Sequence, residues 1–100
     1  MLIHSVYFWL DRKLTPAQKK QFQSAVEKLR GIEVVEQIFV GPPGSTNRPA
    51  VDRTYDVGLA VVLKDLDAHQ TYQDHSIHKN FLQNYSAFWT KVTVYDIQTS

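Results

Sequence analysis

Two segments of the chain, residues 2–10 and 55–63, are predicted to be β-strands, and each carries apolar side chains on both of its sides. The first alternates Leu2, Val6, Phe8 and Leu10 with Ile3, Tyr7 and Trp9, and the second alternates Tyr55, Val57, Leu59, Val61 and Leu63 with Ala60 and Val62. An antiparallel sheet in a small domain usually leaves one polar face in water. We therefore expect something to cover the second face of this sheet as well as the first.

The rest of the chain predicts a helix and two further strands around this pair. Thr15, Pro16 and Gln18 form a helix start with a capping box. The helix is expected over residues 16–30, with Gly31 in the left-handed conformation that often ends a helix. The remaining segments are a second strand over 34–40, a Gly- and Pro-rich loop over 41–53 and a closing strand over 91–97.

The region between the third and the closing strand predicts a helix that is broken near Asp74. Asp65 or Asp67 could cap a short helical turn through Tyr72, and Asp74 or Ser76 could cap the next helix. One face of that helix holds His78, Phe81, Leu82, Tyr85, Phe88 and Trp89. The order β-α-β-β-α-β predicts a single α+β domain over residues 1–100, ferredoxin-like, with a four-stranded antiparallel sheet and helices on one face.

Composition excludes several classes of function. The 11 basic residues are scattered among 10 acidic ones, so no basic stripe offers a nucleic-acid footprint. No apolar run is long enough to span a membrane and no secretory signal is recognisable, so we expect a cytoplasmic protein without membrane contact. The absence of cysteine excludes disulfides, thiol catalysis and thiolate metal sites.

Tyr72 and His78 are the candidate catalytic residues. A phenol and a neutral imidazole can together polarise a carbonyl and move a proton without a cofactor. A histidine in the first turn of a helix meets the positive end of the helix dipole, which disfavours the imidazolium form. The alternative is that both are core residues with satisfied hydrogen bonds.

The other histidines give weaker signals. His75 and His78 lie about one helical turn apart and could offer two metal ligands, but no third ligand follows a known spacing, so we expect neither a metal nor a cofactor. His4 lies on the apolar side of the first strand, where burial would demand a partner, although the exposed start of the strand is the more usual place. The space between Tyr72, His78 and Trp89 is the candidate substrate pocket.

The chain resembles the stress-responsive dimeric A/B barrel (Dabb) family nearly from end to end. The resemblance rests on Leu2-Ile3-His4, on Tyr55-Asp56, on the Tyr72-x-x-His75-x-x-His78 block and on the Phe88-Trp89 and Tyr95-Asp96 pairs. The family commonly has Pro where this chain has Ser76, which should alter the turn and not the fold. The resemblance implies a homodimer in which two subunits pair through their open sheet faces and close an α/β barrel.

The resemblance also reaches a plant polyketide cyclase branch of the family, in which a Tyr and a His act as acid and base. Tyr72 and His78 match those positions, and His4 matches a pocket-lining His. Val57 stands where the cyclases have another pocket His, and Phe8 narrows the cavity, so a different substrate is implied. Two hypotheses follow: a cofactor-independent cyclase, lyase or isomerase acting on a small carbonyl compound, or a non-catalytic dimer that binds a small apolar ligand or has a stress-related structural role.

Overall fold

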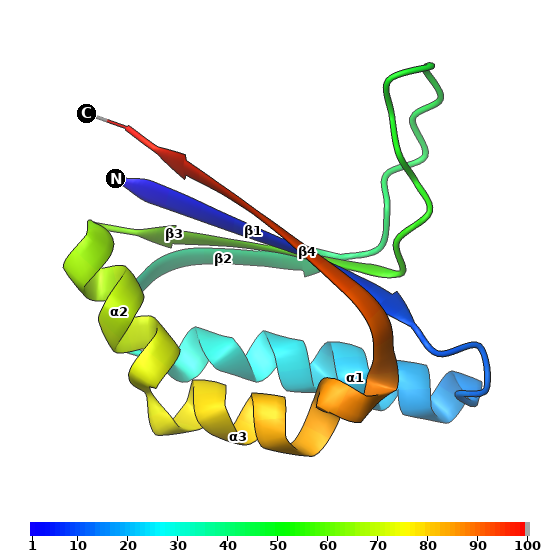
Figure 1. Ribbon diagram of the computed structural model, residues 1–100, viewed down its shortest axis with the longest axis horizontal. Coiled ribbons are helices and arrows are strands. Elements are labelled where there is room, and N and C mark those ends of the chain that lie inside the picture. Colours follow the sequence, from blue (N-terminus) through cyan, green and yellow to red (C-terminus); the bar gives the residue numbers. More distant parts are fainter. Residues whose placement is uncertain (100) are drawn as a thin grey trace.

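The computed structural model describes residues 1–99 as one antiparallel sheet with helices packed against one face (Figure 1). The strands are β1 (Leu2–Leu10), β2 (Val35–Gly41), β3 (Val57–Leu63) and β4 (Trp89–Gln98), and the helices are α1 (Pro16–Glu27), α2 (Leu66–Asp74) and α3 (Ser76–Tyr85). The strand order β2-β3-β1-β4 confirms the ferredoxin-like fold. None of the described helices is long and apolar enough to cross a membrane.

β1 occupies the centre of the sheet because it pairs with both β3 and β4. Its alternate residues, beginning with Leu2 and including His4 and Phe8, are buried against the helices, whereas the residues between them are half-buried on the opposite face. In the β1–β4 ladder His4 lies directly opposite Asp96. The two ends of the chain thus lie side by side at one end of the sheet (Figure 1).

The start of α1 follows the predicted capping box. The backbone N–H of Gln18 donates to Thr15 Oγ1 at 3.1 Å, and the backbone N–H of Thr15 donates to Gln18 Oε1 at 2.8 Å. The predicted end is wrong, because the α-helix stops at Glu27 and tightens into a 3-10 helix over Lys28–Gly31. No glycine in residues 1–99 has a positive φ, so Gly31 does not act as a left-handed cap.

The second helical region is two helices, α2 and α3. Asp65 caps α2 through the backbone N–H of Ala68, as expected. His75 caps α3 in place of Asp74 or Ser76, because its Nδ1 accepts the backbone N–H of Ile77 at 3.1 Å. α3 ends at Tyr85, so Trp89 begins β4 and does not belong to the helix.

The predicted apolar face of α3 also includes one residue that is not part of the core. Leu82 is 41% exposed, whereas Phe81 on the same helix is buried. Adjacent positions on a helix are separated by about 100°, so both cannot face the sheet.

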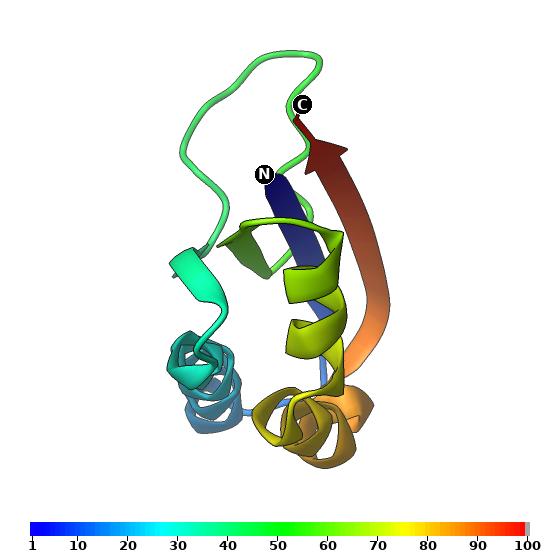
Figure 2. The same cartoon turned by 90° about the vertical axis from the view of Figure 1, so that its left-hand side faces the viewer.

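The second face of the sheet is uncovered in a single subunit (Figure 2). Three large apolar side chains on it, Phe39, Tyr95 and Ile97, are 60%, 65% and 58% exposed. The segment between β2 and β3 rises on this same side, away from the helices (Figures 1 and 2). Its last turn packs against the open face, with the ring of Tyr55 centred 4.9 Å from that of Tyr7.

Candidate functional site

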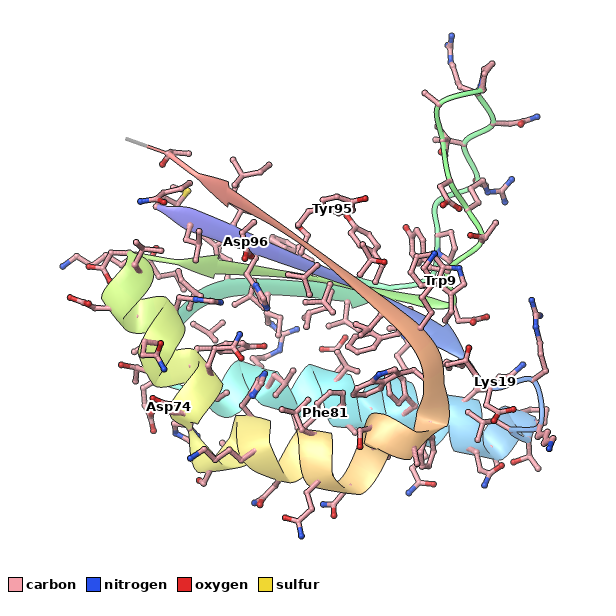
Figure 3. The ribbon with its side chains drawn as sticks, in the orientation of Figure 1. Trp9, Lys19, Asp74, Phe81, Tyr95 and Asp96 are labelled. Atoms are coloured by element: carbon pink, nitrogen blue, oxygen red, sulfur yellow. The ribbon has the colours of Figure 1, made fainter. Side chains whose placement is uncertain are left out.

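A cluster of polar and aromatic side chains lies on the helix side of the sheet, where β1 and β4 meet α2 and α3. Its members come from four elements: His4 on β1, His69 and Tyr72 on α2, His78 on α3, and Asp96 on β4. Asp96 and Tyr95 are adjacent on β4 and project to opposite sides of the strand, Asp96 toward the helices (Figure 3). The cluster therefore requires the sheet and both later helices to be in place.

His4 is the buried end of this cluster. It is only 5% exposed, and its Nδ1 lies 2.6 Å from Asp96 Oδ1. The expectation of an exposed position at the strand start is wrong, because the β1–β4 register places a carboxylate directly opposite the imidazole. The Asp96 side chain is 41% exposed, so the pair reaches from the core to the surface.

Tyr72 and His78 are brought together as predicted from the sequence. Their ring centroids lie 4.9 Å apart, and the residues are 1% and 9% exposed. Burial raises the pKa of the Tyr72 hydroxyl above its ordinary value of 10.0. Burial, and then the positive charge that His4 can carry, lower the pKa of His78 below its ordinary value of 6.5. Both side chains are therefore neutral near neutral pH.

One ring nitrogen of His78 is both buried and unsatisfied. Its Nδ1 is buried and makes no hydrogen bond to any residue in the described part of the chain. Leaving a buried polar atom unpaired costs stability, and such atoms in native proteins are often functional. The described contacts therefore leave this nitrogen of His78 unsatisfied.

Sequence reasoning did not assign Asp96 to this cluster, and it did not assign His69 on α2 either. The ring of His69 is centred 4.9 Å from that of His4, which in turn lies 5.8 Å from that of Tyr72. Burial and the charge of His4 lower the pKa of His69, and Asp96 opposes them. The one available signal was its spacing, one helical turn before Tyr72.

His75, the other member of the sequence-predicted histidine pair, lies outside the cluster. Its Nε2 lies 3.2 Å from Glu33 Oε2, and its Nδ1 caps α3. These contacts make His75 a helix-entry residue and separate it from His78.

Val57 and Trp89 lie further along the sheet from Tyr72 and His78. Val57 is paired with Phe8, and the Trp89 ring packs 5.0 Å from that of Phe8 and 5.9 Å from that of Phe81. These aromatic rings fill the space toward Trp89. Hollows do occur elsewhere on residues 1–99. One of about 310 Å³ lies on the open face and is lined by Tyr7, Tyr55, Tyr95 and four further side chains, Trp9, Asp52, Lys91 and Thr93.

Sequence comparison places this arrangement in a family. The profile of the Stress responsive A/B Barrel Domain matches residues 2–99. The chain belongs to this family. No curated protein matches this A/B barrel domain significantly by sequence.

Solved structures share the fold of this A/B barrel domain. A Dabb family protein with a ferredoxin-like fold from Mesorhizobium loti is 23% identical, with 99% of this chain and 96% of that chain covered and a TM-score of 0.81. A dimeric ferredoxin-like protein of unknown function from Thermobifida fusca is 21% identical, with 98% and 90% covered and a TM-score of 0.80. The hydroxynitrile lyase from Passiflora edulis is 13% identical, with 99% and 93% covered and a TM-score of 0.81.

Proposed function

We propose that this A/B barrel domain catalyses proton transfer on a small carbonyl compound, as a lyase, isomerase or cyclase that uses Tyr72 and His78. The observation that carries the proposal is the buried Tyr72–His78 pair, with rings 4.9 Å apart and an unpaired Nδ1 on His78. A neutral phenol beside a neutral imidazole supplies an acid and a base at the same pH. This chemistry needs no cofactor.

Each residue has a distinct role in the proposed step. The Tyr72 hydroxyl donates a hydrogen bond to the carbonyl oxygen, and His78 accepts the proton from the adjacent carbon, so that the electron pair of the broken C–H bond moves to the oxygen as an enolate. The protonated His78 then returns the proton to a carbon or to a leaving group. His4, paired with Asp96, lines the polar wall of the site. Val57 and Trp89 remain the residues that we predict to contact the substrate at the apolar end of the site.

The substrate of such a site is small. Phe8 and Phe81 are 3% and 6% exposed and occupy the direction of Trp89, so a long ligand has no room there. The substrate is expected to enter from the side of His69 and Asp96, which is the solvent-accessible edge of the cluster. One of the similar structures is an enzyme, a hydroxynitrile lyase, but at 13% identity it carries over the fold alone and no reaction or substrate.

The working protein is proposed to be a homodimer that pairs through the open sheet face. Exposed Phe39, Tyr95 and Ile97 would be covered by the partner, which accounts for the second apolar face of β1 and β3. The dimeric state of the similar protein from Thermobifida fusca supports this arrangement.

The proposal is tested by α-proton exchange. Wild-type protein is incubated in D₂O with a panel of small ketones and 1,3-diketones, and NMR follows the loss of the α-proton signal. We expect catalysed exchange of at least one compound, a loss of about 10²–10⁴-fold in His78→Gln, and a loss of about 10²-fold or more in Tyr72→Phe.

Two matched variants serve as controls for that experiment. Tyr85→Phe removes the hydroxyl that accepts from Gln21 Nε2 on the surface, and His75→Asn replaces a capping histidine with another capping residue. Both should exchange at the wild-type rate. Unchanged exchange in folded His78→Gln contradicts the role of His78, and an absence of catalysed exchange across the panel removes the enzymatic proposal.

The second candidate function is a non-catalytic dimer that binds a small apolar ligand or has a stress-related structural role. The observation in its favour is the aromatic packing of Phe8, Phe81 and Trp89, which fills the direction in which a large substrate pocket was expected. A wild-type protein inactive across the panel supports this candidate.

A further inference from the structure

A second kind of chemistry is available where β1, α2 and β4 meet. His4, His69 and Asp96 each offer one ligand atom, and these atoms lie within 4.8 Å of one another. We propose that the three side chains form a site for a divalent transition-metal cation of the zinc type. The proposal does not depend on the proton transfer described above.

The distances are close to those of a coordinated cation. Ligand atoms bound at about 2.1 Å in a tetrahedral arrangement lie roughly 3.4 Å apart. The 2.6 Å contact between His4 Nδ1 and Asp96 Oδ1 would open slightly, and the wider separation would close by side-chain rotation. The Asp96 carboxylate has the freedom for this because it lies on an edge strand and is 41% exposed.

The surroundings favour a cation held by neutral imidazoles. A metal ligand must be an unprotonated nitrogen, which each neutral imidazole supplies. A dication would also take the place of the proton that lies between His4 and Asp96. Tyr72 and His78, which face the cluster from α2 and α3, are both held neutral by burial and add no positive charge near neutral pH.

The groups around the three ligands have the features of a partly open metal site. The Gln73 amide nitrogen lies 3.1 Å from His69 Nε2. If His69 binds the cation through Nδ1, a flip of this amide brings its oxygen to Nε2, where it accepts the remaining ring N–H, as outer partners of metal-binding histidines do. His4 is buried whereas Asp96 reaches the solvent, so a cation can approach the cluster from the side of Asp96. Two imidazoles and one carboxylate suit Zn²⁺, Co²⁺, Ni²⁺ or Fe²⁺ better than Mg²⁺ or Ca²⁺.

This site escapes sequence reasoning for a physical reason. Metal motifs are recognised by ligands at short fixed spacings, whereas these three ligands come from two strands and one helix. The histidine pair that has a regular spacing, His75 and His78, is separated by the contact of His75 with Glu33.

The test uses Co²⁺ as the probe and the untagged full chain as the protein. Titration is followed by the visible absorption of bound Co²⁺, and Zn²⁺ is then added in competition. We expect one Co²⁺ per chain, displacement by Zn²⁺, and at least about tenfold weaker binding in Asp96→Asn and in His69→Gln. His75→Asn, which changes a histidine outside the cluster, should bind as the wild type does.

Three results overturn the proposal. They are no Co²⁺ absorption band with the wild type at millimolar metal, wild-type affinity in folded Asp96→Asn and His69→Gln, and an equal loss in His75→Asn. Asp96 is a surface residue on an edge strand, so its variant keeps the fold, and thermal unfolding without metal checks this. The readout is metal binding alone, so its failure is separate from a failure of the proton-exchange experiment.

Discussion

Burial sets the protonation of the histidines on the helix side of the sheet. His69 and His78 both have lowered pKa values, for which desolvation is the largest cause in each case. A neutral imidazole in the folded state becomes an easily protonated one when the chain unfolds. The same desolvation that keeps His78 neutral therefore makes the fold sensitive to acid.

The free energy of unfolding should fall as the pH is lowered. Because the folded-state pKa of His78 lies below its unfolded value near 6.5, the unfolded chain binds more protons between these two values. The stabilisation is complete above about pH 6.5 and is lost as the pH falls through the folded pKa. Urea unfolding at about pH 7.5 and about pH 5.5 should show this loss, and His78→Gln should lose less. An equal pH dependence in the variant would assign the effect to other groups.

At the residue scale the sequence predicted the pair that is separated by a short stretch of chain. Tyr72 and His78 come close because α2 and α3 are consecutive, so local spacing was enough. The contacts of His4 with Asp96 and His69 depend on the register of β1 against β4 and on how α2 lies across the sheet. Neither the strand register nor the position of α2 can be read from a single sequence, because pairing between distant segments leaves no local signal.

Helix starts in this chain are fixed by side chains next to them. Thr15 and Gln18 exchange two hydrogen bonds at the start of α1. At the start of α2, the Asp65 side chain accepts one hydrogen bond, from the backbone N–H of Ala68. These bonds satisfy backbone N–H groups that have no partner within the helix. This is why the start of α1 was predicted correctly.

Removal of the Thr15 cap should destabilise the domain by about 0.5–2 kcal/mol. Thr15→Ala loses the acceptor for the Gln18 backbone N–H, and the measurement is urea unfolding monitored by circular dichroism. Thr46→Ala, at an exposed loop position, is the matched control and should stay within about 0.5 kcal/mol of the wild type. Equal stability of the two variants would show that the capping box contributes nothing measurable.

Helix ends were predicted less well than helix starts. α1 tightens into a 3-10 turn where a left-handed glycine was expected, and Trp89 begins β4 where a helix face was expected. An aromatic side chain at position 89 packs against Phe81 whether the backbone there is helical or extended. Apolar periodicity alone could not distinguish the two, and tertiary packing decided.

The whole molecule has one covered and one uncovered sheet face. The uncovered face carries large apolar groups from the edge strands β2 and β4, including Phe39 and Tyr95, and it extends to Tyr55 at the end of the segment that precedes β3. Monomeric proteins rarely leave such a surface in water. The double-sided apolar pattern of β1 and β3 had predicted that the second face of the sheet is apolar and needs a cover.

Substitution on that face should weaken the proposed dimer. Tyr95→Glu places a charge where an aromatic side chain would be buried, and loss of such an interface residue commonly costs 2 kcal/mol or more, which is about a 30-fold rise in Kd. Analytical ultracentrifugation should find a dimer for the wild type and monomer for the variant at low micromolar concentration. Leu82→Glu, an exposed apolar position on α3, is the control and should remain dimeric. A dimer of unchanged strength in Tyr95→Glu would exclude this face.

The pairing of β1 with β4 also orders events during synthesis of the chain on the ribosome. β4 leaves the ribosome after every other described element. His4 therefore has no Asp96 carboxylate to bind until β4 has been synthesised. Until then β1 presents an unpaired strand edge and an imidazole without its carboxylate. A nascent chain stopped before β4 would expose an aggregation-prone edge and would lack the Asp96 carboxylate, so the His4–Asp96 contact is the last part of the site to form.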